Sequence, residues 1–257
     1  MRKKWIYGFQ PWVIPFALLL TWQVTASMKL VTPSLFPSPI SVLVTFWELL
    51  MSGELVRHVF ASLWRAGIGL MIGGLIGFAL GILNGLSTTS YRYLDSTIQM
   101  IRNIPHLALL PLVIVWIGID EGAKIFLVII GVLFPIYINT FHGIRNVDHD
   151  LVEMGKMYKL KGWRLFKDIL LPGALPSIFV GLRYALGVMW LTLIVAETIP
   201  TEVGIGYLAT NAREFMQTDI IILSIIIYAL LGKIADIIAQ IGEKWSLKWN
   251  VSYNKEL

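Results

Sequence analysis

The sequence has 257 residues, of which 56% are apolar and 14% are charged, and its mean hydropathy is +0.72. Soluble domains carry roughly a quarter charged residues, so this composition indicates a membrane protein. The net charge of +5 could suggest a nucleic-acid partner. However, the basic residues flank apolar runs, where they orient a chain in a membrane, so no nucleic-acid partner is expected. The absence of cysteine excludes disulfides and a thiol nucleophile.

Six apolar segments could cross a membrane as helices. The charge-free runs Ala66–Tyr91 and Ile125–Ile144 are each long enough to cross ~30 Å of hydrocarbon. The other segments are shorter or contain charges such as Arg183, Lys233 and Asp236. The predicted fold is an all-α membrane protein with six transmembrane helices in one domain, 1–257. In chain order, the predicted spans are approximately 11–28, 64–86, 103–119, 124–144, 173–197 and 219–241.

The first segment has two interpretations. It follows Arg2, Lys3 and Lys4, as the apolar region of a signal peptide would. However, no A-x-A-like cleavage site follows it, and Trp12 and Trp22 suit anchoring at the membrane interface. We therefore expect a retained span.

The distribution of basic residues predicts the sidedness of the chain. Most of the 21 Lys and Arg lie in the N-terminus, in loops such as Arg145–Lys167, and in the C-terminal tail. Basic loops stay on the cytoplasmic side of a membrane. Six spans place all three of these segments there, so both termini are expected to be cytoplasmic.

Glycines recur at every fourth residue along the second span. Such tandem spacing lets two helix backbones approach closely in lipid. We favour packing within one subunit, and the alternatives are a seam between two subunits or the lining of a path. The five residues are Gly69, Gly73, Gly77, Gly81 and Gly85.

The third span begins with two closely spaced prolines, in the stretch NIPHLALLP from Asn103 to Pro111. Proline removes a backbone donor and frees a carbonyl that only protein or a wet cavity can satisfy. The pattern is equally consistent with an interrupted helix beside a path and with a kinked or loop-capped helix start.

The segment Asp148–Pro172 is too polar to cross a membrane. Its apolar residues are interleaved with charges, which predicts short amphipathic helices with a face for a partner. The alternative is a helix lying on anionic lipid headgroups.

Several catalytic patterns are absent from the sequence. There is no G-x-x-x-x-G-K-[ST] phosphate loop, no histidine pair at metal-ligand spacing and no G-x-S-x-G nucleophile turn. We therefore expect no catalytic, cofactor-binding or metal-binding residues, and the chain is not predicted to be an enzyme.

The segment Asp148–Pro172 also resembles the signature loop of ABC importer permeases, with a glutamate, a turn and the run Ile169–Pro172. Longer blocks, such as LFPIYINTFHGIRNVD from Leu133, resemble the aliphatic sulfonate permeases of the nitrate, sulfonate and taurine branch. The resemblance covers most of residues 10–250. It implies an ABC importer permease fold whose cytoplasmic coupling helix, between spans four and five, lies in the loop 148–172.

By that resemblance, certain residues of the loop would meet the ATPase subunit. The family has two small residues after its glutamate and a glycine at position 159, whereas this chain has Met154, Gly155 and Lys159. The expected ATPase-coupling residues are Glu153, Met154, Gly155, Lys159, Gly162 and Pro172.

The resemblance also implies a function and partners. The importer would contain two copies of this chain, two ATPase subunits that hold ATP and Mg, and an extracytoplasmic solute-binding protein, in the cytoplasmic (inner) membrane. The implied cargo is an aliphatic sulfonate, and the alternatives are taurine, nitrate or a pyrimidine precursor. An ATP-independent secondary transporter is the less favoured reading, because central acidic residues and inverted repeats are not seen.

A sulfonate is a permanent anion, so its path requires hydrogen-bond donors and positive potential. Arg183 and Arg213 are the charged candidates for the substrate path. The alternative for Arg183 is a side chain that snorkels to the interface, and for Arg213 a surface ion pair. Polar or amphipathic groups within apolar spans complete the candidates: Asn139, Trp190 and Thr192.

Overall fold

The computed structural model describes residues 2–28, 32, 35–199 and 201–249, with side chains from residue 13 on. The chain forms helices and no strand within these ranges. It divides into two compact bodies, the N-terminal body (up to Ala61, with Glu202–Tyr228) and the central body (Ser62–Thr201, with the chain from Ala229 on). The prediction of a single domain stays a prediction.

Side-chain hydrogen bonds connect separate segments of the N-terminal body. The indole of Trp22 donates to the Pro37 carbonyl at 3.1 Å, and the Thr45 hydroxyl donates to Asp219 at 2.6 Å. Ser38 caps the second helix, and the first residue of that helix is proline. Both features favour the start of a helix. The helices are α1 (Arg2–Ser27), α2 (Pro39–Met51), the start of α3 (Glu54–Leu86), α10 (Ile205–Glu214) and the start of α11 (Thr218–Ser246).

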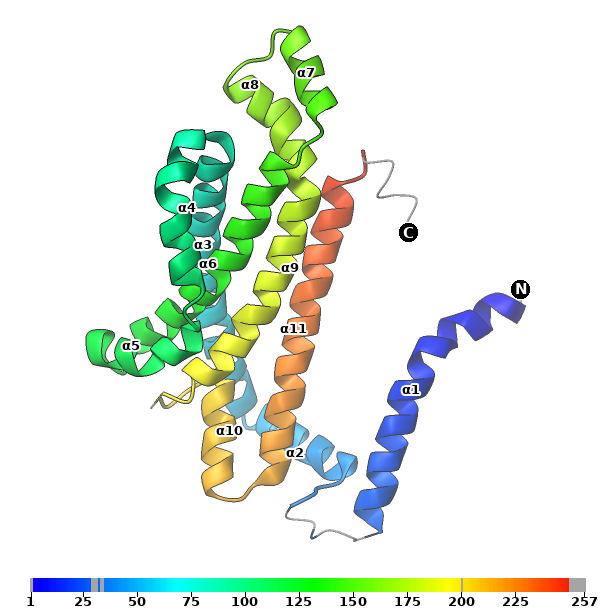
Figure 1. Ribbon diagram of the computed structural model, residues 1–257. Coiled ribbons are helices and arrows are strands. Elements are labelled where there is room, and N and C mark those ends of the chain that lie inside the picture. Colours follow the sequence, from blue (N-terminus) through cyan, green and yellow to red (C-terminus); the bar gives the residue numbers. More distant parts are fainter. Residues whose placement is uncertain (1, 29–31, 33–34, 200, 250–257) are drawn as a thin grey trace. The chain divides into compact units, whose positions relative to one another are not determined.

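The central body is a bundle in which α4, α6 and α9 run side by side, with α7 and α8 beyond the ends of α6 and α9 (Figure 1). Helices α6 and α9 pack against each other extensively. Besides the rest of α3 and α11, it contains α4 (Thr88–Arg102), the 3₁₀ turn η1 (His106–Leu109), α5 (Leu110–Ile117), α6 (Glu121–Arg145), α7 (His149–Met157), α8 (Trp163–Leu165), the π turn η2 (Phe166–Leu170) and α9 (Leu171–Ala196).

Four helical runs of the described chain are long and apolar enough to span a membrane, namely α3, α6, the run Trp163–Ala196 and α11. A fifth would be a bent pair, α4 with the η1–α5 segment, whose parts meet at 77°. The stretches Val13–Ser27 and Pro39–Met51 are apolar helices of shorter length.

The region of the third expected span, 103–119, is divided differently in the structure. The apolar pair begins at Thr88, and its break lies at Asn103–Pro105. Pro105 has no backbone donor and disfavours the helical conformation at Ile104, which explains the end of α4. The structure therefore has two helical segments here, which bend by 77° at the break Asn103–Pro105.

The helical run that corresponds to the fifth expected span begins earlier than expected, at Trp163 rather than 173. The second half of the segment 148–172 is therefore helical and continuous with α9. Phe166 and Ala174 of this run form a small core with Ile144, and partly buried Val147 packs against it. This core joins the end of α6 to the helical run that continues into α9.

Candidate functional site

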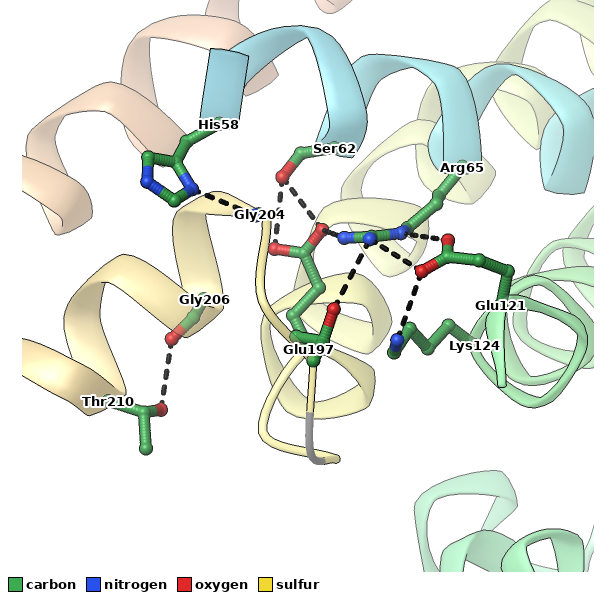
Figure 2. A network of polar contacts seen from close by, with 10 residues as sticks. His58, Ser62, Arg65, Glu121, Lys124, Glu197, Gly204, Gly206 and Thr210 are labelled. Carbon is green, nitrogen blue, oxygen red and sulfur yellow. Dashed lines mark hydrogen bonds and ion pairs between the residues drawn. The ribbon is translucent and has the colours of Figure 1, made fainter. Parts of the chain in front are cut away.

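A buried cluster of charges joins three helices of the central body. Arg65 of α3 is 3% exposed, and its Nη1 donates to Glu197, the residue after α9, at 2.6 Å. Its Nη2 donates to Glu121, the first residue of α6, at 2.7 Å. Ser62 also donates to Glu197, and buried Lys124 lies 3.1 Å from Glu121 (Figure 2). The two cations and two anions balance in charge; Arg65, Lys124 and Glu197 are buried, whereas the Glu121 side chain is 55% exposed.

The sequence predicted none of the pairings in this cluster. The sequence does contain a signal for one pair, because Arg65 directly precedes a long apolar run and Glu197 directly follows another. A charge at that position needs a partner, so two opposite charges at such ends are candidates for a pair.

Arg183 is ion-paired with α11. Its Nε donates to Asp236 at 2.8 Å, and its Nη1 lies 3.4 Å from Glu243. The side chain of Arg183 is 38% exposed. The two carboxylates offset the positive charge expected to attract an anion.

The other substrate-path candidates are not brought together. Arg213 is exposed on α10, in the N-terminal body. The Asn139 amide donates to the Pro135 carbonyl at 2.9 Å within α6. Trp190 lines an apolar cavity of about 300 Å³ walled by α3, α9 and α11. Thr192 is fully buried, and its hydroxyl lies 2.9 Å from Nε2 of His106.

A second cavity of the central body, of about 280 Å³, lies at the break between α4 and η1. Its walls come from α4, η1, α6 and α9, and they include Arg102 and His106. The sequence singled out this stretch for its prolines but assigned no role to either residue. Their proximity to α6 and α9 depends on the bend at Pro105.

The five periodic glycines of α3 lie against α6. A Cβ on Gly73 would lie 3.0 Å from the Cα of Ile129, and a Cβ on Gly77 would lie 3.2 Å from the backbone nitrogen of Tyr137. Gly69, Gly81 and Gly85 approach Val128, Thr140 and Ile144 of α6 in the same way. Within this chain the glycines therefore permit close packing of two helices, as small-residue spacing does in membranes.

Helix α7, in the expected coupling segment, ends in a left-handed turn. Lys159 has a φ of +61°, its N–H donates to the Lys156 carbonyl at 2.9 Å, and the N–H of Leu160 donates to Gly155 at 3.0 Å. These bonds form a Schellman motif, in which the left-handed residue is usually glycine. Because this chain has lysine here instead of glycine, Lys159 adopts a left-handed conformation that is unfavourable for a residue with a side chain.

The remaining expected coupling residues differ in exposure. Glu153 and Met154 are exposed on α7, whereas Gly155 is buried, and a Cβ there would lie 2.9 Å from Leu165. Gly162 has a φ of +54° in the turn before α8, and Pro172 lies in the first turn of α9. The segment is thus a helix with an exposed outer face, held on its inner face by Gly155.

The chain was compared with known proteins. It is 57% identical to the SsuC permease protein of Escherichia coli, named for transport of aliphatic sulfonates, over 98% of this chain and 96% of that protein. The SsuC protein of Bacillus subtilis is 41% identical over 98% of this chain and 90% of that protein. A crystal structure of an amino acid ABC transporter shares the fold, with a TM-score of 0.62, 17% identity, and coverage of 79% of this chain and 96% of that one.

A family model also matches residues 69–246, which include most of α3 and all of α4 to α11. The predictions of an ABC importer permease fold and of a transport subunit rather than an enzyme are confirmed by this match and by the relatives. The chain belongs to the family of binding-protein-dependent transport system inner membrane components.

Proposed function

We propose that this chain is the permease subunit of an importer that carries aliphatic sulfonates into the cell. The observation that supports this cargo is the 57% identity, over nearly the whole chain, to a permease named for aliphatic sulfonates. Membership of a binding-protein-dependent family favours an ATP-driven importer with a solute-binding protein over an ATP-independent secondary transporter. Taurine, nitrate or a pyrimidine precursor is the alternative cargo for the same role.

The proposed assembly contains two copies of this chain, two ATPase subunits and one extracytoplasmic binding protein. Each copy would cross the inner membrane six times, with both termini in the cytoplasm, and the first of these spans would be residues 11–28, largely within α1. ATP and Mg would be held by the ATPase subunits. Closure of the two ATPase subunits would move both permeases between inward-open and outward-open states.

We assign the contact with the ATPase to α7. Its exposed residues include Met154 and Met157, and Tyr158 and Trp163 are exposed just beyond its end. Large apolar side chains that are exposed in a polar segment are typical of an interaction surface. The core around Phe166 would transmit motion of α7 to α6 and α9.

Growth tests the cargo. A strain that lacks this chain should fail to grow with an alkanesulfonate as its sole sulfur source, and restoring the chain should restore growth. Normal growth of the deletion strain, with no second sulfonate importer present, would refute the cargo. Copurification in mild detergent tests the assembly, and absence of an ATPase subunit would refute it.

The substrate-path candidates Arg183 and Arg213 remain proposals. Uptake by Arg183→Gln and by Arg213→Gln should fall while the assembled complex and its ATPase activity persist. Because Arg183 is paired with Asp236 and Glu243, its loss also tests whether these contacts hold α9 to α11. Normal uptake by both variants would remove the two arginines from the path.

A further inference from the structure

The cavity at the break between α4 and η1 combines a charged group with apolar walls. Ile130, Phe134 and Ile138 of α6 and Val188 of α9 supply apolar surface. Arg102, the last residue of α4, is the charged residue among those that line it. Pockets for small ligands have this construction, with mostly apolar walls and a few polar groups that orient the ligand.

Arg102 has no carboxylate partner in the described part of the chain. Arg65 and Arg183 each pair with two acidic residues, and Arg145 lies over the rings of Tyr91 and Phe141. Arg102 is exposed, and no ion pair joins it to another described residue. A guanidinium within an apolar helical pair is tolerated where it faces protein or a wet cavity. It therefore gives this cavity a positive potential.

The imidazole of His106 is held in place by Thr192. The Thr192 hydroxyl donates to the Val188 carbonyl at 2.8 Å and lies 2.9 Å from Nε2 of His106. Both contacts are satisfied together when Nε2–H donates to the threonine oxygen, which fixes the proton on Nε2. Gly131 makes room for this arrangement, because a Cβ there would lie 2.8 Å from the Thr192 hydroxyl.

Resting on the proposed function, we infer that this cavity is a binding station for an alkyl-bearing oxyanion on its way through the membrane. The guanidinium of Arg102 pairs with the anionic head, because its planar donors match two oxygens of one oxyanion. The walls around Phe134 receive the alkyl tail, and the His106–Thr192 pair fixes one wall. A single cation retains the anion weakly enough for release, as conduction requires.

The first experiment uses the intact transporter in proteoliposomes with its binding protein. Arg102→Gln should reduce uptake of ethanesulfonate about tenfold or more, because the charge-assisted hydrogen bonds to the oxyanion are lost. Arg102→Lys keeps the charge but loses the planar pair of donors, so its uptake should fall between that of Arg102→Gln and that of the unmodified transporter. The matched control is Arg92→Gln, an exposed arginine on the same helix outside the cavity, with uptake expected to equal that of the unmodified transporter.

A second variant addresses the cavity walls without touching the charge. Phe134→Ala enlarges the cavity, so uptake of hexanesulfonate relative to ethanesulfonate should rise about threefold or more, because each added methylene needs apolar room. The same binding protein is used throughout, so that a change in the ratio arises in the permease. ATPase activity and size-exclusion profiles identify variants that fail to assemble.

Two results together would overturn the binding station. The uptake rate of an assembled, ATPase-active Arg102→Gln transporter would be reduced by less than about threefold, and Phe134→Ala would leave the ratio of hexanesulfonate to ethanesulfonate uptake unchanged. Uptake by the unmodified transporter tests the proposed cargo separately. The comparison of each variant with the unmodified transporter can be made with whichever oxyanion is carried. The cargo and the station can thus fail independently.

Discussion

The buried charge cluster predicts a large loss of stability when Glu197 loses its charge. Glu197 is 1% exposed and accepts hydrogen bonds from Arg65 and Ser62. Glu197→Gln keeps the shape of the side chain but leaves the Arg65 cation with Glu121 as its remaining carboxylate. Breaking a buried ion pair costs about 3–5 kcal/mol, and the lower end applies because Glu121 still contacts Arg65.

A loss of about 3 kcal/mol lowers the melting temperature of a chain of this size by roughly 6–12 °C. Thermal unfolding of the purified transporter in detergent measures this shift. The matched control is Glu54→Gln, a carboxylate exposed on α3, with an expected change within about 0.5 kcal/mol. The double variant Arg65→Met with Glu197→Met should be more stable than the sum of the single effects predicts.

A shift for Glu197→Gln no larger than that of the Glu54→Gln control would refute this reasoning. Strict additivity of the two methionine substitutions would refute it as well, because residues that share a buried ion pair must couple. Either result would mean that the cluster contributes little to holding α3 and α9 together.

Three further predictions concern backbone geometry. Lys159→Gly should stabilise the protein by about 0.5–1 kcal/mol, seen as a higher melting temperature, whereas Lys159→Val should lower it, because β-branched residues disfavour the left-handed conformation. Gly77→Ala should cost about 1–3 kcal/mol by overpacking against α6, while Gly67→Ala, which meets open space on the same helix, should be neutral or stabilising in the same unfolding assay. Gly155→Leu should displace α7 from Leu165 and lower transport-coupled ATPase activity while assembly persists; normal coupling would contradict the assigned role of this turn.

The long spans follow from sequence because the bilayer imposes a local requirement. A helix that crosses hydrocarbon needs about 20 apolar residues, and α3, α6 and α11 satisfy this in unbroken or nearly unbroken runs. Helix α4 was not among the predicted spans because charged and polar residues interrupt its apolar residues. Its Asp95 lies near the Tyr137 hydroxyl, and Tyr91 stacks on Phe141, so polar groups that look external in sequence have partners on α6.

The left-handed turn at Lys159 shows the limit of a family pattern. The family pattern has glycine at this position, and in the structure the lysine there has a φ of +61° and lies in a turn with two backbone hydrogen bonds. Both hydrogen bonds join residues that are at most five positions apart in the sequence. The positive φ of Lys159 nevertheless could not be predicted from the residue type and is known only from the folded backbone. A Schellman turn is therefore hard to predict from sequence when its left-handed residue is not glycine.

The sequence by itself determined that this protein is helical, lies in a membrane and resembles the ABC importer permeases, because these properties depend on composition, on apolar run length and on long matching blocks. Tertiary structure alone decided which charges meet. Arg65 and Glu197 are 132 positions apart, and their contact depends on how α3 and α9 are rotated and crossed. The same holds for His106 and Thr192, which meet because the break at Pro105 turns the chain toward α9.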